Sequence, residues 1–382
     1  MSYFDLPPII DRMLNAADNI SDLNFSVGKP PQVESNGKLI PVELPGLEVL
    51  TSYHTDIIAM ALLQNHPDGA ASLVKSGSAD ISYSLPNRVH FRVSIFSRRG
   101  GSYSIVMRVI PSKIPTIESL GLPPQLGEIA NLKTGIVLVT GPTGSGKSST
   151  LAAIIDKINT EKHYHIITIE DPIEFIHPHK NSTINQRELG SDTPTFALAL
   201  RAALRQAPKV ILVGEMRDVE TIEVALEAAE TGHLVLSTLH TTDASKTVDR
   251  IIGVFPKNEE RAIRTRLSQA FRYIIAQRLI PRADGRGRVA AVEILRSTPR
   301  TREYVEKGES EGKTLIDAMR DGSLDGMQTF DSVLEKLIKN GTITQEDGLA
   351  FATNPHNLML HLSGLGSSSD FENVKDFRPS RF

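Results

Sequence analysis

The feature that most constrains this chain is a glycine-rich segment between an apolar run and a stretch of helix-forming residues. The apolar run covers residues 135–139, and the helix-forming stretch covers residues 149–155. A strand, a glycine loop and a helix in this order predict a P-loop, a turn that binds phosphate. The residues that we expect to bind a nucleoside triphosphate are Gly141, Pro142, Thr143, Gly144, Ser145, Gly146, Lys147, Ser148 and Ser149.

Each part of this loop has a chemical reason to be there. Glycines let successive backbone N–H groups curl around phosphate oxygens, and the N-terminus of the following helix adds positive potential. Lys147 is placed to reach the β- and γ-phosphates, and the Ser148 hydroxyl is placed to hold Mg²⁺. ATP and Mg²⁺ are therefore the expected cofactors.

Composition limits the other classes of function. The chain has 382 residues and is 40% apolar, which fits roughly two or three domains with ordinary cores. A formal net charge of −3 gives no basic excess, so nucleic acid is not an expected partner. The absence of cysteine excludes disulfides and thiolate zinc sites. Because neither a signal sequence nor an apolar run of about 18 residues is seen, we expect a cytoplasmic protein.

The N-terminal part of the chain is predicted to be an α+β domain covering residues 1–110. A short amphipathic helix near 9–17 is followed mainly by strands, including a hairpin over 89–96 and 104–110. Residues 111–124 carry four prolines and no long periodic run, so we expect the interdomain linker there.

A second domain is predicted over residues 125–365. Strands near 136–139, 165–169, 210–213 and 234–237 alternate with helices near 149–159, 195–206 and 219–230. This alternation predicts a parallel sheet with helices on its faces. From about residue 259 the chain is predicted to be rich in helix, with one helix over 329–338, and residues 366–382 are expected to form a mobile tail.

Two acidic groups follow apolar strands in this second domain. Glu215 comes directly after the run 209–214, where a carboxylate can act as general base or orient the attacking water. Glu170 and Asp171 end another apolar run, and Pro172 then forces the chain out of the sheet. We expect these two carboxylates to hold Mg²⁺ or its water ligands, and Glu170 is the preferred member of the pair.

Two histidines, His233 and His240, bracket the predicted strand 234–239. Seven positions apart on a straight strand they face opposite sides, so both can approach one nucleotide only if a strand end curls. One is therefore expected to sense phosphate, while the other has a structural role.

Taken in order, these motifs resemble those of the secretion and type IV pilus ATPase superfamily. Residues 141–148, 169–175, 214–218 and 231–240 correspond to its Walker A, Asp, Walker B and His boxes. Residues 21–39 and 326–331 resemble the N-terminal and C-terminal signatures of its PilT/PilU retraction ATPases, and the likeness runs from about residue 10 to 362.

The resemblance implies a fold, an assembly and a function. The fold is a PAS-like N-terminal domain joined to a RecA-like ATPase core with a helical C-terminal part. The assembly is a homohexameric ring at the pilus base, on the cytoplasmic face of the inner membrane, where it acts on a platform protein. ATP hydrolysis would power pilus retraction and twitching motility. Arg99 and Arg108 match N-terminal-domain arginines that reach the γ-phosphate, whereas Arg201, Arg205 and Arg217 are weaker candidates for phosphate or subunit contacts.

Departures from the family pattern keep alternatives open. Asn24 replaces the usual histidine, residues 299–306 differ from the usual retraction-ATPase helix, and residues 174–179 are closer to the accessory PilU branch. One alternative is thus an accessory ATPase that acts only with a principal retraction motor. Pilus-extension and type II secretion ATPases usually carry a four-cysteine zinc element, which this chain lacks. A DNA-translocating RecA-like ring is disfavoured by the acidic charge balance.

Overall fold

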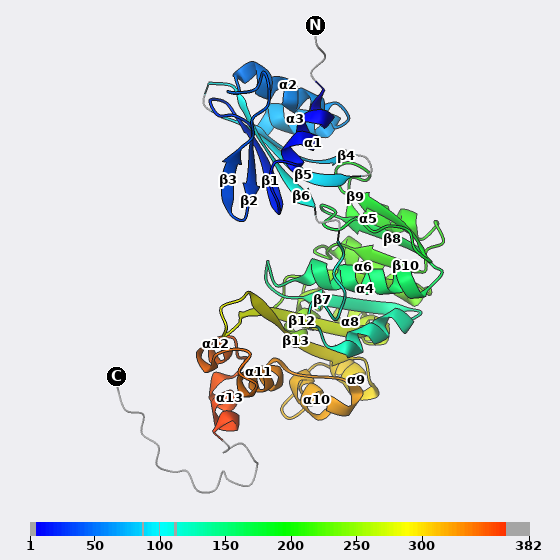
Figure 1. The fold of residues 1–382 in the computed structure, drawn as a ribbon. Coiled ribbons are helices and arrows are strands. Elements are labelled where there is room, and N and C mark those ends of the chain that lie inside the picture. Colours follow the sequence, from blue (N-terminus) through cyan, green and yellow to red (C-terminus); the bar gives the residue numbers. More distant parts are fainter. Residues whose placement is uncertain (1–4, 86–87, 99, 111–112, 364–382) are drawn as a thin grey trace. The chain divides into compact units, whose positions relative to one another are not determined.

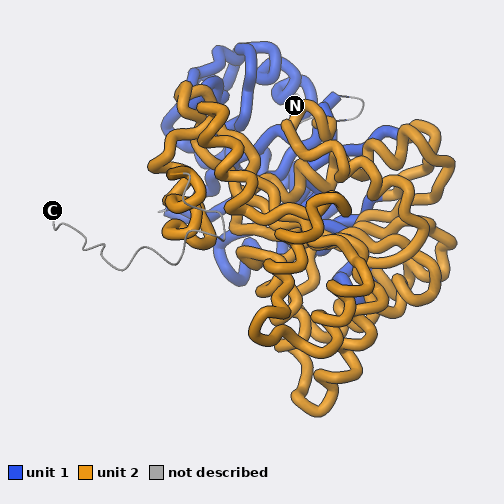
Figure 2. The backbone as a smooth tube through the Cα atoms, turned by 90° about the horizontal axis from the view of Figure 1, so that it is seen from below, with its two compact units in different colours: residues 1–114, 169–178, 186–199 blue, residues 115–168, 179–185, 200–382 orange. Residues whose placement is uncertain are grey.

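The computed structural model describes residues 5–85, 88–98, 100–110 and 113–363. The chain forms two compact units (Figure 2): unit 1 comprises residues 1–114, 169–178 and 186–199, and unit 2 comprises residues 115–168, 179–185 and 200–382. The tail predicted over 366–382 lies outside the described residues. The predicted domain boundaries at 110 and 125 stay predictions.

Most of unit 1 is an α+β domain built on one antiparallel sheet with the strand order β3-β2-β1-β6-β5-β4 (Figure 1). Its elements are α1 (Leu6–Leu14), β1 (Ile20–Ser26), β2 (Gln32–Ser35), β3 (Lys38–Pro41), α2 (Ser52–Leu63), α3 (Pro67–Ser76), β4 (Ser78–Leu85), β5 (Val89–Ser97) and β6 (Tyr103–Ile110). The predicted hairpin is confirmed as β5 and β6. Helix α1 begins earlier than predicted because a proline in its first turn needs no N–H partner there.

The core of this domain lies between one face of the sheet and the three helices. Leu23, Met107 and Val93, which are partners across β1, β6 and β5, are fully buried there with Ile10 and Ile58 of the helices. Because side chains alternate along a strand, the residues between these positions lie on the opposite face of the sheet. That opposite face carries the polar and charged side chains of the same strands.

The rest of the chain is built on a seven-stranded sheet with the order β13-β12-β7-β11-β10-β8-β9. Its elements are the 3₁₀-helix η1 (Pro124–Asn131), β7 (Gly135–Thr140), α4 (Lys147–Glu161), β8 (His165–Glu170), β9 (Thr183–Glu188), α5 (Phe196–Ala203), β10 (Val210–Val213), α6 (Val219–Glu230), β11 (Leu234–Leu239), α7 (Ala244–Ile252), α8 (Glu260–Ala270), β12 (Phe271–Pro281) and β13 (Arg288–Arg296). Strands β10, β11, β7 and β12 are parallel neighbours, and the predicted alternation of strands and helices is confirmed.

The region after residue 259 was predicted only as helix-rich, and this prediction was incomplete. Strand β12 continues the parallel sheet beside β7, and β13 pairs antiparallel with it at the sheet edge. Helical elements follow: α9 (Pro299–Lys307), α10 (Leu315–Asp321), η2 (Ser323–Asp325), α11 (Phe330–Lys339), α12 (Gln345–Ala350) and α13 (Pro355–Leu362). The structure thus confirms the mixed α/β architecture, with a sheet domain followed by a parallel-sheet core and a helical C-terminal part. In the part of the chain that the structure describes, no helix combines the length and apolarity needed to cross a bilayer.

Candidate nucleotide-binding and hydrolysis site

The glycine loop joins the end of the fully buried strand β7 to the first residue of α4. Gly141, Gly144 and Gly146 have φ angles of 145°, 76° and 90°, a region that L side chains rarely adopt. At Gly141 a Cβ atom would lie 2.5 Å from the Gln277 carbonyl oxygen and from Ser145 Oγ. The loop therefore needs glycine both for its backbone turn and for its close approach to β12.

Two polar side chains of the loop are buried. Lys147 is 8% exposed, and its Nζ donates to the carbonyl oxygens of Gly141 and Pro142 at 3.0 Å each. Ser145 Oγ is buried and has no hydrogen-bond partner among the described residues. A buried polar atom is normally paired, so this hydroxyl fits an oxygen-bearing ligand such as a phosphate group.

Strand β12 supports the loop from one side. The Thr150 hydroxyl on α4 donates to Gln277 Oε1 at 2.9 Å, and both side chains are almost fully buried. Gln277 was not predicted from the sequence, although a single amide in the mainly apolar stretch 271–281 is the signal that could have found it.

A pocket of about 530 Å³ opens beside the loop. Residues 142–145 and 350–353 line it, Arg278, Arg288 and Lys246 bring positive charge, and Asp243 brings one negative charge. The Arg278 guanidinium lies 3.7 Å from the centre of the Phe330 ring and also donates to the Phe351 carbonyl oxygen. This setting suits a negatively charged ligand with a flat apolar part.

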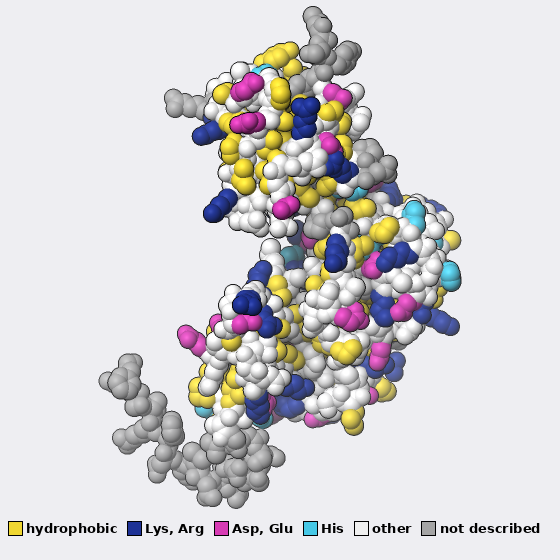
Figure 3. Space-filling view, in the orientation of Figure 1, with side chains coloured by type: hydrophobic (Ala, Val, Ile, Leu, Met, Phe, Trp, Pro, Cys, Tyr) yellow, Lys and Arg dark blue, Asp and Glu magenta, His cyan; other side chains and the backbone are white. Residues whose placement is uncertain are grey.

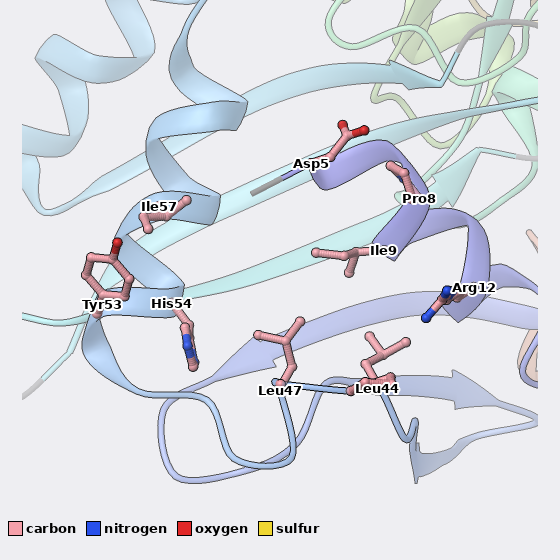
Figure 4. A pocket seen from close by; sticks show the side chains of 11 residues that line it. Asp5, Pro8, Ile9, Arg12, Leu44, Leu47, Tyr53, His54 and Ile57 are labelled. Carbon is pink, nitrogen blue, oxygen red and sulfur yellow. The ribbon is translucent and has the colours of Figure 1, made fainter. Parts of the chain in front are cut away.

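The N-terminal domain contains a different kind of pocket, of about 490 Å³ (Figure 4). Figure 4 shows apolar side chains such as Ile9, Leu44 and Leu47 lining it, with Arg12 and His54 among them. Among the described residues that border this pocket, none belongs to a glycine-rich phosphate loop. The pocket beside residues 142–145 is therefore the candidate nucleotide site.

Glu215 lies two residues beyond the end of β10, and its side chain is 18% exposed. Bonds between the strand ends fix the backbone around it, since Ser237 Oγ donates to the Val213 carbonyl at 2.7 Å and Thr238 Oγ1 to the Gly214 carbonyl at 2.6 Å. Arg217 Nε lies 2.5 Å from Glu215 Oε2, and His240 Nε2 lies 3.8 Å from the same oxygen.

The pKa of His240 is lowered, first by burial and then by the positive charge of Lys147, and Glu215 only partly opposes this. Imidazole therefore stays neutral near pH 7 and can donate one hydrogen bond and accept another. Because the charges of both Lys147 and Glu215 act on the pKa of His240, these three residues lie in one site in unit 2.

The structure separates the two histidines. His233 precedes β11 and its Nδ1 lies 2.9 Å from the Ala228 carbonyl oxygen, whereas His240 follows the strand. Seven residues of extended chain place the two rings about 20 Å apart. The structure therefore brings His240, but not His233, together with Glu215.

Glu170 and Asp171 lie at the end of β8 and belong to unit 1. Glu170 Oε1 accepts a hydrogen bond from Gln186 Nε2 at 3.1 Å, while Asp171 is exposed. Neither belongs to a cluster of three potential metal ligands, and the described residues contain no such cluster. Their proposed link to Mg²⁺ stays a prediction.

The candidate arginines have different surroundings. Arg99 lies outside the described residues, and Arg108 on β6 pairs with Asp22. Arg201 pairs with Glu220 at 2.6 Å, Arg205 is exposed, and Arg217 holds Glu215 as described above. Of these weaker candidates, Arg217 is the one found beside Glu215 among the described residues.

Comparisons with known proteins identify the family of this chain. The family described as Type II/IV secretion system protein matches residues 75–346. The type IV pilus retraction ATPase PilT of Pseudomonas aeruginosa is 43% identical over 343 residues, which cover 90% of this chain and 97% of that protein. The pilus ATPase PilU of the same organism is 40% identical, with coverage of 93% and 90%.

Solved structures give the same result. The crystal structure of the pilus retraction motor PilT with bound ADP has a TM-score of 0.80 and 41% identity, and it covers 93% of this chain and 98% of that one. The ATPase DotB of Legionella pneumophila has a TM-score of 0.77 and 30% identity, with coverage of 96% and 98%. This chain is therefore an ATPase that belongs to the type II/IV secretion system family.

Proposed function

We propose that this chain is a hexameric motor that hydrolyses ATP to power type IV pilus retraction, and with it twitching motility. The observation that carries the proposal is the likeness to PilT over almost the whole length of both chains, together with the P-loop and Glu215 in one site. A motor of this kind acts on the pilus machinery from the cytoplasmic face of the inner membrane, through a platform protein and as a homohexamer.

The chemistry that we propose is attack of water on the γ-phosphorus of ATP. Glu215 accepts the proton of the attacking water, because its carboxylate is held by Arg217 and lies beside the neutral His240. The bond to the leaving β-phosphate oxygen breaks, and ADP and inorganic phosphate are released. Neutral His240 supplies a hydrogen bond that changes with the state of the γ-phosphate. Arg99 and Arg108 of the N-terminal domain stabilise the negative charge that develops.

The P-loop fits nucleotide with Mg²⁺. Its turn directs backbone amides at phosphate, and the orphaned Ser145 hydroxyl provides one more donor. Ser148, half-buried in the first turn of α4, would hold Mg²⁺, and Glu170 and Asp171 would hold its water ligands. When bound, the ion neutralises phosphate charge.

The surface fits a protein partner better than nucleic acid. Figure 3 shows Lys and Arg interspersed with Asp and Glu on the visible face, and the formal net charge of the chain is −3. Nucleic acid binding relies on releasing counterions from a concentrated basic surface. A DNA-translocating ring is therefore not proposed.

Complementation of a strain without its retraction motors tests the proposal. The parent chain should restore twitching, while Lys147→Ala should not, because the phosphates lose the loop's dedicated cation. Restoration only when a principal retraction ATPase is also supplied would favour the accessory alternative, which the similarity to PilU also supports. No effect on twitching in either strain, with normal ATP hydrolysis by the purified chain, would contradict the pilus function.

A further inference from the structure

Arg108 on β6 makes one defined contact, with Asp22 on β1. Its Nε donates to Asp22 Oδ1 at 3.0 Å, and the two residues face each other directly across the strands. The Asp22 side chain is 8% exposed, whereas that of Arg108 is 70% exposed. The Asp22 carboxylate is thus fixed within the domain, and the Arg108 side chain extends from it toward solvent.

The pair lies on the charged face of the N-terminal sheet, opposite the helices. In the sheet register Arg92 on β5 faces Arg108 on one side, and Glu34 on β2 faces Asp22 on the other. The like charge of Arg92 disfavours movement of Arg108 toward β5, and the two carboxylates attract it toward β1. The charges of Arg92, Asp22 and Glu34 therefore hold the Arg108 guanidinium over Asp22.

The contact uses only one edge of the guanidinium. Nε is the donor to Asp22, and the two terminal amino groups make no hydrogen bond within the described residues. Those groups form the planar fork that binds two oxygens of one phosphate. A guanidinium already fixed in its plane loses less conformational freedom when it binds such a ligand.

We propose that Asp22 is a positioning residue that holds Arg108 by Nε and presents its two terminal amino groups to the γ-phosphate. This inference rests on the proposed function, in which Arg108 contacts the phosphate during hydrolysis. Asp22 itself touches neither nucleotide nor water in this scheme. Its effect on turnover passes entirely through Arg108.

The test uses the full-length chain and four variants: Asp22→Asn, Arg108→Ala, the double variant, and Asp11→Asn. The last is a matched control, since it breaks the Arg88–Asp11 ion pair of the same domain, whose two partners are partly exposed. Steady-state ATP hydrolysis gives kcat and KM separately, and thermal unfolding reports on folding. Asp22→Glu, which keeps the charge but moves the carboxylate, serves if Asp22→Asn does not fold.

Asp22→Asn should lower kcat roughly tenfold, the scale of loss expected from misplacing an oriented group, and leave KM within about twofold. In the Arg108→Ala background the same change should have no further effect, because the group that Asp22 positions is gone. Asp11→Asn should retain the parent kcat. If Asp22→Asn does not fold, Asp22→Glu should show an intermediate kcat.

Each other outcome overturns a distinct claim. Parent turnover in Arg108→Ala would contradict the proposed role of Arg108, whatever Asp22 does. A second outcome is that Arg108→Ala loses turnover while Asp22→Asn, or Asp22→Glu if only that variant folds, keeps it. That result would contradict the positioning role of Asp22 alone. An equal loss from Asp22→Asn in the presence and absence of Arg108 would show that Asp22 acts on the fold rather than through the arginine.

Discussion

At the scale of single residues, the proposed role of Glu215 is to activate the attacking water. Arg217 and His240 both approach its Oε2, so the carboxylate is oriented. Glu215→Gln keeps the size of the side chain but cannot accept a proton. We expect this variant to bind ATP like the parent and to hydrolyse it about 10²–10⁴-fold more slowly. ATPase rates, with nucleotide affinity measured separately, check this.

The matched control for this prediction is Glu170→Gln at the other acidic strand end. If Glu170 holds water ligands of Mg²⁺, its loss should make turnover more dependent on the Mg²⁺ concentration, whereas Glu215→Gln should not change that dependence. Near-parent turnover by Glu215→Gln would place the base elsewhere, and Glu170 would become the leading candidate.

Glu293 on β13 is a buried carboxylate that the hydrolysis scheme does not use. It accepts a hydrogen bond from the Ala244 N–H at 2.9 Å, at the start of α7, and another from the Phe330 N–H, at the start of α11. Burial raises its pKa to about 7, and the two N–H groups and Arg278 oppose this rise less strongly. The folded protein therefore binds a proton here that the unfolded chain releases near its ordinary pKa of 4.5.

The sign of the pH dependence follows from that difference. The proton bound at Glu293 stabilises the folded protein, and this contribution is fully present below pH 4.5. The free energy of unfolding falls by up to about 3 kcal/mol as the pH rises from there through about 7. Glu293→Gln should remove this dependence, so the variant should gain free energy of unfolding relative to the parent between pH 5 and pH 8. Urea unfolding at both pH values measures it, with the exposed Glu223→Gln as control. Parallel pH profiles for the parent and Glu293→Gln would contradict the assignment.

At the scale of elements, the contact between β12 and α4 supports the P-loop. Gln277→Leu should leave the buried Thr150 hydroxyl unpaired, at a cost of about 1–3 kcal/mol in stability, and weaken nucleotide binding. Adding Thr150→Val removes the unpaired group and should recover most of the stability. Chemical denaturation of the single and double variants measures both effects. A double variant as unstable as Gln277→Leu would show that the hydrogen bond is not the cause.

The same elements show what sequence can predict here. The P-loop, the Glu215 strand and the alternation of strands and helices were predictable because each is a contiguous pattern. The support from Gln277 and the pairing of Asp22 with Arg108 were not, since they join residues 127 and 86 positions apart. Strands β12 and β13 were missed because their apolar residues also fit a buried helix. Only the pairing of β12 with β7 and of β13 with β12 decides between strand and helix. The position of His233 depended on the straightness of β11, which spacing alone left open.

At the scale of the whole molecule, the hydrophobic cores are separate. The core of the N-terminal domain draws on residues between Leu6 and Met107, whereas the main core of the ATPase part draws on residues between Ile117 and Ile294. Unit 1 nevertheless includes residues 169–178 and 186–199, and Ser82 of β4 donates a hydrogen bond to Glu188 of this region. The N-terminal domain is therefore expected to affect hydrolysis without being required for folding of the core.

Removing residues 1–110 tests this expectation. The remaining chain should unfold cooperatively, because its sheet and P-loop are self-contained, and it should still bind nucleotide weakly. It should hydrolyse ATP poorly, since Arg99 and Arg108 leave with the domain and Glu188 loses the Ser82 hydroxyl. Nucleotide titration, ATPase rates and sedimentation of the truncated chain measure these properties. Because the loss of a ring would also lower turnover, the comparison is made at concentrations where the truncated chain is still oligomeric. Undiminished turnover by that oligomer would show that the two arginines are surface residues and that the core alone completes the hydrolysis site.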